Sequence, residues 1–432
     1  MLINDIIMDI LYVLGTLLGL LYAYHVLYMI IGFFHKPKLF EKADKNRFAV
    51  LISARNEESV IRDLLNTINN QSYPAELIDI YVIADNCTDK TADIARECGA
   101  IVYERFNKEK VGKGYALETL YDYIFETRGN DYYDGYFVFD ADNLLEPDFI
   151  EEMNKTFSAG YKVVTSYRNS KNFGSNWISA GYAIWFLREA RYLNNSRMIL
   201  GTGCAISGTG FLVHRDVINK TNGWKYFLLT EDIEFTIANL IKGEKVGYCH
   251  TAMLYDEQPE DFMQSWNQRL RWAKGMLQVF FKYGGKLVAG IFKGPHRVAC
   301  YDLTMTILPL MIITIVTVLM NIVLIANDVV LGATTGDFTE IFRFVMTLAA
   351  GVGGGYMSMF LLALLVTVTE WKAINTTTFR KILYLFTFPI YMATYIPIGF
   401  VALFKNVEWT PIRHTVSTNL DALKEKGNTK KK

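Results

Sequence analysis

Cysteine is scarce in this sequence. Five cysteines occur among 432 residues, at positions 87, 98, 204, 249 and 300. Their number is odd, and no two have the spacing of a metal-binding or thiol–disulfide redox motif. The sequence gives no sign of a disulfide framework, and we expect all five to be reduced, buried thiols.

An excess of either charge is also missing. Lys and Arg total 44, as do Asp and Glu, so the chain as a whole lacks the basic field that attracts nucleic acid. Charged residues make up only 20%, whereas AVILMFWYC reach 51%. The apolar residues gather in the first 34 positions and in the last third. This distribution indicates a membrane protein whose middle part is soluble, with room for two or three domains.

The first apolar segment, residues 6–34, contains Asp9 and His25 as its only acidic or basic side chains. It exceeds the roughly 20 residues that a membrane-spanning helix needs. A secretory signal peptide is the alternative, but the start is acidic and the end bulky, which disfavours one. Lysines and Arg47 follow between 36 and 47, so positive-inside logic places residue 35 onward in the cytoplasm.

Three further apolar segments, at 298–326, 342–369 and 382–404, are each long enough to cross a membrane. If all three cross, the tail after residue 404 lies outside, yet its Lys405, Arg413 and lysine-rich end favour the inside. Pro389 and Pro397 interrupt the last segment, and residues 349–355 are rich in glycine. One of the three is therefore a candidate for a broken or re-entrant segment.

Short apolar runs alternate with helical patterns in the soluble part. We expect strands at 48–53, 78–84, 100–103, 137–140, 162–167 and 245–249, and helices at 57–71, after 89, at 113–126, from 147 and at 177–200. This alternation is typical of a mostly parallel, doubly wound α/β sheet.

Asp140 and Asp142 come directly after the apolar run 136–139. Ligands bind at the carboxyl edge of open α/β sheets. Two carboxylates at this spacing can face one Mg²⁺ or Mn²⁺ ion that also binds substrate phosphates. A polar turn after a strand is the alternative reading of this short pattern.

Three other patterns are candidates for a site. Glu231 and Asp232 offer a general base, or else begin a helix that Thr230 caps. In Gln268-Arg-Leu-Arg271-Trp272, the arginine suits a pyrophosphate and the tryptophan a sugar ring, although tryptophan also anchors helices at membrane surfaces. Residues 201–210 hold four glycines, typical of backbone close to a ligand or of a mobile loop.

Residues 261–292 form an amphipathic pattern with too many charges to cross a bilayer. Such a helix suits the membrane interface, or else packs on the soluble part.

Taken in order, these patterns resemble the family 2 glycosyltransferases over about residues 45–275. The residues that carry the resemblance are Ala54-Arg-Asn-Glu57, Asp85 in Asp-Asn-Cys-Thr-Asp, Lys113-Gly114, Asp140-Ala-Asp142, Thr230-Glu-Asp232 and Gln268-Arg-Leu-Arg-Trp272. Within that family the chain is similar to membrane-embedded synthases related to cellulose, chitin, hyaluronan and poly-N-acetylglucosamine synthases.

The resemblance implies a GT-A α/β domain inserted between transmembrane helices in an integral membrane protein. We expect a transmembrane helix over 1–35, a cytosolic GT-A domain over 36–260, amphipathic helices over 261–297, about three membrane segments over 298–404 and a basic tail over 405–432. The implied location is the plasma membrane, with several passes and the catalytic domain in the cytoplasm.

The resemblance also implies roles for residues. A UDP-sugar would be held by Ala54, Arg55, Asn56, Glu57, Asp85, Lys113 and Asp140, with Gly208 and Thr209 in the loop that lines the acceptor site. Asp140 and Asp142 would bind Mg²⁺ or Mn²⁺. The implied catalytic residues are Asp232, as the base, with Glu231, Gln268, Arg271 and Trp272.

The implied activity is inverting transfer of a sugar, GlcNAc or Glc, from a UDP-sugar to a polysaccharide or glycolipid acceptor. With about four spanning segments, a closed polymer channel in one subunit is not expected, and a homo-oligomer or an accessory membrane subunit is possible. A polyprenyl-phosphate sugar synthase, a non-catalytic scaffold with a retained fold and a transporter are the alternatives.

Overall fold

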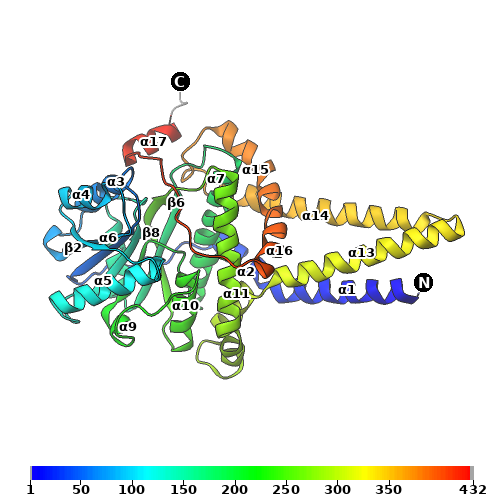
Figure 1. Cartoon of the computed structure of the whole chain (residues 1–432), viewed down its shortest axis with the longest axis horizontal. Coiled ribbons are helices and arrows are strands. Elements are labelled where there is room, and N and C mark those ends of the chain that lie inside the picture. The colour runs from blue at the N-terminus through cyan, green and yellow to red at the C-terminus, as the bar shows by residue number, and fades with distance from the viewer. Residues whose placement is uncertain (1, 429–432) are drawn as a thin grey trace.

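The computed structural model describes residues 2–428, which form an α/β body from which long helices project (Figure 1). The strands are β1 Phe48–Ala54, β2 Ile78–Asp85, β3 Ile101–Arg105, β4 Gly135–Asp140, β5 Leu144–Leu145, β6 Val163–Ser170, β7 Phe211–His214 and β8 Val246–Asp256. The helices of the body are α3 Ile61–Asn69, α4 Thr91–Glu97, α5 Lys113–Arg128, α6 Phe149–Ser158, α7 Trp177–Arg188, α8 Asn195–Leu200, α9 Arg215–Asn219, α10 Glu231–Ile241 and α17 Leu420–Asn428, with a 3₁₀ turn at Ala75–Leu77.

These eight strands form one sheet in the order β3-β2-β1-β4-β7-β6-β8-β5. The pairs from β3 to β4 are parallel, as are β6 and β8, whereas β7 runs antiparallel to both of its neighbours. The prediction of a mostly parallel sheet with helices between the strands is therefore confirmed, and β5 and β7 are additions to it.

Side chains of the central strand alternate between two apolar layers. Phe48, Val50 and Ile52 of β1 pack in the cluster that contains α3 and α6, while Ala49 and Leu51 face α5 and α7. Successive side chains of a strand point to opposite faces, so β1, in which only Ser53 is polar, serves both layers. The sheet is thereby buried on both faces, and its ligands are left to approach at the strand ends.

The remaining helices connect the body to the projecting part. They are α1 Leu2–Tyr22, α2 Tyr24–Phe34, α11 Phe262–Lys293, α12 Arg297–Ile307, α13 Leu310–Thr335, α14 Thr339–Thr369, α15 Thr378–Ala393 and α16 Tyr395–Phe404. Four segments are long and apolar enough to cross a membrane, namely Asn4–Phe34, Ile312–Thr335, Ile341–Thr369 and Thr378–Phe404.

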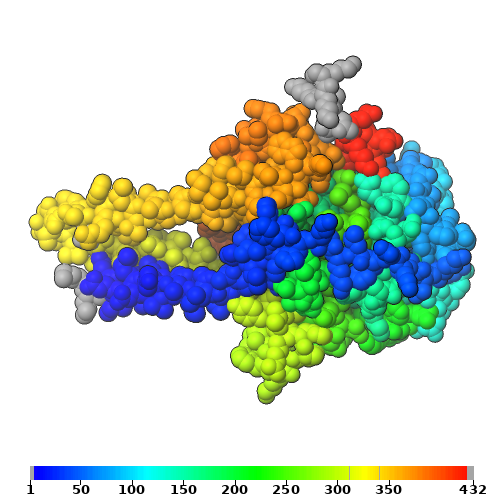
Figure 2. All heavy atoms as spheres, turned by 180° about the vertical axis from the view of Figure 1, so that it is seen from behind, coloured from blue at the N-terminus to red at the C-terminus, as the bar shows by residue number. Residues whose placement is uncertain are grey.

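Only some of these segments project. Helices α1, α13 and α14 leave the body together, whereas α15 and α16 lie against it, in contact with α7 and α11 respectively (Figures 1 and 2). The Thr378–Phe404 segment is also the most buried of the four within the protein.

The structure corrects the expected limits of the C-terminal apolar segments. The segment expected at 298–326 is broken at Leu308-Pro309 into α12 and α13, because proline lacks the N–H that a continuous helix needs. The connector expected at 327–341 is mostly helical, and only residues 336–338 separate α13 from α14. The glycines at 351–355 lie within the uninterrupted α14, while the last segment breaks at Thr394.

A buried ion pair fastens the membrane helices to the body. Arg197 of α8 donates from Nε and Nη2 to the two carboxylate oxygens of Asp302 in α12, at 2.7 and 2.8 Å. The hydroxyls of Tyr24 and Tyr28 on α2 donate to the same carboxylate, at 3.1 and 2.9 Å. Three segments far apart in sequence therefore meet at one carboxylate.

Replacement of Asp302 by asparagine tests this junction. Asp302→Asn leaves the Arg197 guanidinium buried without a counter-charge, which costs about 3–5 kcal/mol. We expect a clearly lower midpoint of thermal unfolding for the detergent-purified protein. Glu97→Gln, which removes the exposed pair with Arg62, is the control and should change the midpoint little. Equal midpoints for both variants would contradict the role of the junction.

Candidate active site

A cavity of about 640 Å³ opens at the carboxyl edge of the sheet. It is lined from the ends of β1, β4, β6 and β8, from the start of α10, from one face of α11 and from the C-terminal tail. The predicted residues that line it are Arg55, Glu57, Lys113, Asp140, Asp142, Gly208, Glu231, Asp232, Gln268, Arg271 and Trp272. Positions 55 and 272 are thus brought to one site although most of the soluble part lies between them.

The predicted residues Ala54, Asn56, Asp85 and Thr209 do not line this cavity. Asp85 is buried and bonded to Arg105 at 2.5 Å, while Asn56 accepts from the Thr88 N–H at 2.8 Å. The Thr209 hydroxyl accepts from the Asp140 N–H at 2.9 Å. In this structure the side chains of these three residues fix loops beside the site.

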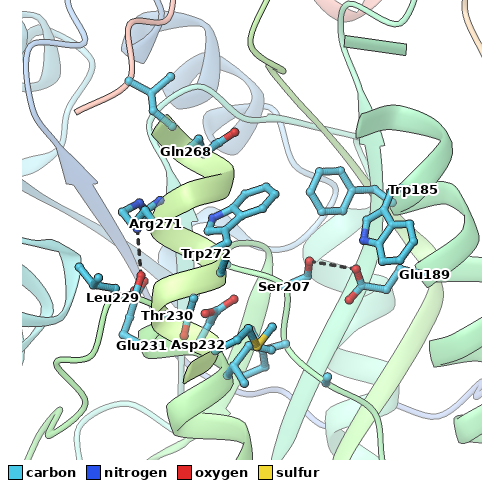
Figure 3. Close-up of a pocket in the computed structure, with 18 of the residues that line it drawn as sticks. Trp185, Glu189, Ser207, Leu229, Thr230, Glu231, Asp232, Gln268, Arg271 and Trp272 are labelled. Atoms are coloured by element: carbon cyan, nitrogen blue, oxygen red, sulfur yellow. Dashed lines mark hydrogen bonds between the residues drawn. The ribbon is translucent and has the colours of Figure 1, made fainter. Parts of the chain in front are cut away.

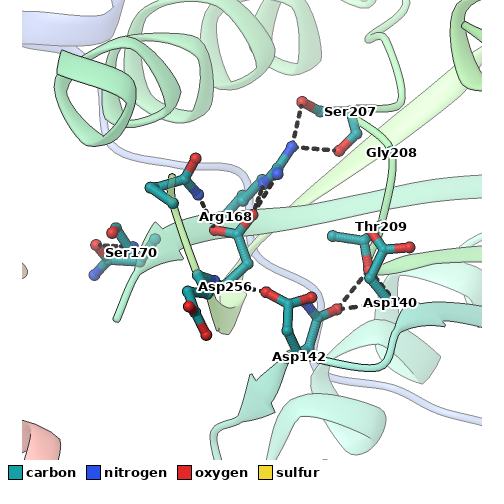
Figure 4. Close-up of polar contacts among 12 residues, drawn as sticks. Asp140, Asp142, Arg168, Ser170, Ser207, Gly208, Thr209 and Asp256 are labelled. Atoms are coloured by element: carbon teal, nitrogen blue, oxygen red, sulfur yellow. Dashed lines mark hydrogen bonds and ion pairs between the residues drawn. The ribbon is translucent and has the colours of Figure 1, made fainter. Parts of the chain in front are cut away.

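Asp140 and Asp142 differ in their surroundings (Figure 4). Asp140 ends β4, and its side chain is 37% exposed and paired with Lys113. Asp142 is buried and accepts from the Glu257 N–H at 2.7 Å. Burial raises the pKa of Asp142, but the positive charges of His414 and Lys171 outweigh it and hold the pKa below its ordinary value. Asp142 is therefore a carboxylate at neutral pH.

This acid pair suits a metal ion that a substrate completes. Among residues 2–428, no three His, Cys, Asp or Glu side chains are grouped as a metal site by themselves. Mg²⁺ is usually held by one or two carboxylates together with substrate phosphates and waters. Asp140 and Asp142 supply two such carboxylates on a cavity wall, so these residues fit a divalent ion shared with a diphosphate.

Lys113 connects the acid pair to the glycine-rich loop. Its ammonium also donates to the carbonyl oxygen of Gly208 at 2.9 Å. Gly208 has a φ of +79°, and a Cβ placed on it would lie 4.0 Å from Oδ2 of Asp232 and 3.9 Å from Nη1 of Arg168. Asp232 therefore lies against the loop that Lys113 joins to Asp140.

Glu231 and Asp232 form a second pair of acids at the start of α10 (Figure 3). Thr230 occupies the N-cap position of α10 with both acids in the first turn, as the helix-cap interpretation expects, but its side chain makes no capping hydrogen bond. Burial, followed by the charge of Asp232, raises the pKa of Glu231 to about 7, and burial raises that of Asp232. The two raised pKa values indicate that this pair of acids can bind a proton near neutral pH.

The helical period places neighbouring residues of α11 on different sides of the helix, some facing the cavity and others the interior. Gln268, Arg271 and Trp272 line the cavity, whereas Arg269 and Leu270 are buried on other faces of the helix. Arg269 donates to the Thr394 hydroxyl at 2.5 Å and lies over the ring of Tyr391 at 4.5 Å. The cavity-lining side of α11 is thereby oriented by contacts that the opposite side makes.

Trp272 lies edge-on to two aromatic rings of α7. Its ring centroid is 5.6 Å from that of Tyr182 and 6.2 Å from that of Phe186. Arg271 donates to the carbonyl oxygen of Leu229 at 3.1 Å, beside the acids of α10. Figure 3 shows Trp272 and Asp232 on one side of the cavity and Trp185 with Glu189 on the other.

Several residues of the site were not singled out in the sequence. Arg168, at the end of β6, pairs with Asp256 at the end of β8 and donates to the carbonyl oxygen of Ser207 at 2.8 Å. Glu189 begins a π-helical turn, Glu189–Asn194, and accepts from the Ser207 hydroxyl at 3.5 Å. Asp140 was identified because it is a polar residue at the end of a strand. Arg168 and Asp256 have the same position on their strands, so the same signal could have identified them.

The C-terminal tail crosses the site, and we call residues 405–419 the strap. Nδ1 of His414 lies 3.0 Å from both carboxylate oxygens of Glu57, and Trp409 lies under the Arg55 guanidinium at 5.4 Å. Burial lowers the pKa of His414, but the charges of Asp142 and Glu57 outweigh it and raise the pKa to about 10. His414 thus adds a positive charge to a wall rich in carboxylates.

Contacts of the strap and of α17 with the α/β body hold the C-terminal tail against that body. Glu257 accepts from the N–H groups of Thr415 and Val416, both at 2.9 Å, and Leu423 of α17 packs on Leu144. The tail is therefore on the same side of the projecting helices as the α/β body, as its basic residues suggested.

A family model described as "Glycosyltransferase like family 2" matches residues 46–275. The chain belongs to this family. The chain is thus a glycosyltransferase, and the resemblance seen in its motifs is confirmed.

Similar proteins come from several bacteria. The "Probable glycosyltransferase YdaM" of Bacillus subtilis is 28% identical over 319 residues, which cover 67% of this chain and 70% of that protein. The beta-monoglucosyldiacylglycerol synthase of Synechocystis sp. is 25% identical over 244 residues, 54% of this chain and 48% of that protein. The poly-beta-1,6-N-acetyl-D-glucosamine synthase of Staphylococcus aureus is 24% identical over 242 residues, 54% and 55% respectively. The match spans about half the length of these two synthases.

A solved structure confirms the GT-A fold. The mannosyltransferase PcManGT from Pyrobaculum calidifontis, in complex with GDP-Man and Mn²⁺, has a TM-score of 0.53 at 15% identity. The superposition covers 90% of this chain and 98% of that chain.

The raised pKa values predict the pH dependence of the activity. A general base acts only when unprotonated, and burial raises the pKa of Asp232, so kcat/KM should rise with pH above the range of ordinary carboxyl groups. In Glu231→Gln the burial that raises the pKa of Asp232 remains, so an acidic limb that belongs to Asp232 should persist. Rates measured across pH for both proteins check this. An acidic limb near pH 4, the range of ordinary carboxyl groups, in the unmodified protein would contradict it.

Proposed function

We propose that this protein is a membrane-bound, metal-dependent, inverting glycosyltransferase. It transfers Glc or GlcNAc from a UDP-sugar to a hydroxyl group of a glycolipid or polysaccharide acceptor. The observation that supports this most is the single cavity that contains Asp140 and Asp142 together with Asp232, Arg271 and Trp272. The names of the relatives, which specify glucosyl and N-acetylglucosamine products, support the choice of sugar.

In this proposal the two acid pairs have separate roles. Asp140 and Asp142 hold Mg²⁺ or Mn²⁺, which when bound offsets the charge of the diphosphate. Lys113 and Arg271 face the same cavity and add positive charge for the departing UDP, since a guanidinium binds phosphate oxygens in pairs. Arg55, Glu57 and the strap enclose the nucleotide end.

Asp232 is the general base at the acceptor end. A hydroxyl loses its proton as it attacks the anomeric carbon, and a single displacement inverts that carbon, which gives a β-linkage from an α-linked donor. A lipid phosphate is already ionised and needs no base. The position of Asp232 on the cavity wall therefore favours a hydroxyl acceptor over a polyprenyl phosphate.

The arrangement of the helices supports a topology with three crossings. If α1, α13 and α14 cross the membrane and α15–α16 lies at its surface, the α/β body and the strap share one side. The basic residues that follow the first segment make that side the cytoplasm of a plasma-membrane protein. The proposed units are the first crossing at 1–35, the GT-A domain at 36–260, the amphipathic α11 region at 261–297, the membrane segments at 298–404 and the tail at 405–432.

An Asp232→Asn variant tests the proposal. The purified protein is incubated with UDP-Glc or UDP-GlcNAc and Mn²⁺, and released UDP and products are measured by mass. Loss of a positioned base reduces rates by about 10²–10⁴, so transfer should nearly vanish while UDP still binds.

Asp216→Asn is the matched control for that experiment. Asp216 pairs with Lys162 outside the cavity and is about half exposed, so its variant should retain full activity. Undiminished turnover in Asp232→Asn would exclude Asp232 as the base. If the unmodified protein neither binds nor hydrolyses any UDP-sugar of the panel, the proposed function is wrong.

A further inference from the structure

The cavity does not end at the acids of α10. It continues to two helix breaks at the base of the projecting part, where the wall is made by Thr306–Leu310 and Thr314 on one side and by Met392, Tyr395, Ile396 and Gly399 on the other. We call this part the membrane limb. Its residues belong to the segments that lead into α13 and that form the junction of α15 and α16.

The two breaks hold the limb open. Pro309 has no N–H, and Leu308 is extended, so α13 starts in a new direction after α12. Thr394 separates α15 from α16 and is held by Arg269 and by its own bond to the Tyr391 carbonyl oxygen at 2.6 Å. The break at Thr394 is thus held by contacts within the fold itself.

The mouth of the limb is apolar and lies on the surface. Leu310 is 38% exposed and Ile396 is 54% exposed, and both also line the cavity. Helices α13 and α16, which carry them, are in contact with each other. With α13 crossing the membrane and α16 at its surface, as proposed above, an apolar opening between them faces acyl chains.

Charges are divided along the cavity. Among the described residues that line it, the cations Arg55, Lys113, Arg168, Arg271 and His414 gather at the nucleotide end. Arg197 also lines the cavity, and its guanidinium is paired with both carboxylate oxygens of Asp302. The acids Glu189 and Asp232 lie between the two ends. The charges of Arg197, Arg168 and Arg188 also act on Glu189, and the first two are already paired with Asp302 and Asp256. A negatively charged head group would therefore meet two carboxylates in a region where two of the three nearby guanidinium groups are already paired.

The middle of the cavity suits a neutral, hydroxyl-bearing head group. Trp185 and Glu189 project from α7 and the π-helical turn, opposite Trp272 and Asp232 (Figure 3). Carboxylates accept hydrogen bonds from hydroxyls, and the aromatic rings offer flat apolar faces. Single π-turns within α-helices often occur at functional sites, in accordance with this position for Glu189.

We propose that the acceptor is an uncharged membrane lipid of the diacylglycerol type, whose acyl chains enter through the membrane limb between α13 and α16 and whose hydroxyl reaches Asp232. This inference rests on the proposed function and specifies its acceptor. The lipid hydroxyl oxygen bonds to the anomeric carbon, the bond from that carbon to the diphosphate breaks, UDP leaves with the electron pair, and Asp232 receives the proton.

A growing polysaccharide fits the structure less well. A polymer that crosses the membrane needs a passage enclosed by protein, because its hydroxyls lose water there. Helices α1, α13 and α14 project with most of their side chains exposed to the surroundings, and the spanning windows of these segments are 0% to 11% buried. Three such helices offer a lateral entry for a lipid.

The experiment uses the full chain in dioleoylphosphatidylcholine nanodiscs with or without dioleoylglycerol, Mn²⁺ and a radiolabelled UDP-sugar. Label is measured in the organic phase, in ethanol-insoluble polymer and as free sugar. We expect label in the organic phase only when dioleoylglycerol is present. Thr314→Trp fills the limb and should reduce this transfer about tenfold or more, with UDP-sugar hydrolysis and UDP binding unchanged.

Leu319→Trp is the matched control. Leu319 is on the same helix, is 56% exposed and does not line the cavity, so its variant should transfer as the unmodified protein does. Label in ethanol-insoluble polymer would overturn the inference in favour of a polysaccharide. Hydrolysis without any lipid product, or transfer that requires a lipid phosphate, would also overturn it. Absence of both hydrolysis and UDP binding would instead show that the proposed function is wrong.

Discussion

The site depends on two hydrogen bonds that the Lys113 ammonium donates, one to the carboxylate of Asp140 and one to the carbonyl oxygen of Gly208. They join the end of β4 to the loop before β7, and that loop lies against Asp232. Lys113 itself begins α5, whose opposite residues are packed beneath the sheet. A single ammonium group therefore sets the position of the donor acids relative to the proposed base.

This arrangement concentrates negative charge in a buried place. Burial of a carboxylate disfavours its charged form, and neighbouring carboxylates add to the effect. The protein reduces the cost of burying these carboxylates in two ways. At the nucleotide end, Lys113, Arg168 and His414 compensate the acids, and Asp142 keeps a low pKa. At the acceptor end, Glu231 and Asp232 have raised pKa values, which suits a group that must accept a proton.

Local patterns in the sequence were enough for much of the fold. The buried strands β1, β2 and β4 are continuous apolar runs with acids or polar loops after them, so both their existence and the position of Asp140 could be predicted. Strand β7 was missed because it is four residues long and follows a glycine-rich loop. The predicted limits of the membrane segments differ from the observed helices at Pro309 and Thr394, because apolar composition alone does not show where an apolar helix breaks.

Contacts between distant segments were beyond sequence reasoning. His414 reaches Glu57 across 357 positions, and no periodic pattern in the tail indicates this. The same applies to Arg197 and Asp302, whose pairing depends on how α8 and α12 pack. The basic residues of the tail favoured the side of the α/β body, whereas crossing by all three C-terminal segments would have put the tail on the other side. The contacts of the tail with the body show that the two lie together.

The central claim is that one cavity binds the sugar nucleotide between the acids of β4 and those of α10. A structure of the full chain with a UDP-sugar and Mn²⁺ tests this most directly. The account predicts the diphosphate beside Asp140, Asp142 and Lys113, with the sugar extending toward Asp232 and Trp272. A nucleotide bound outside this cavity, or a sugar that points away from Asp232, would contradict it.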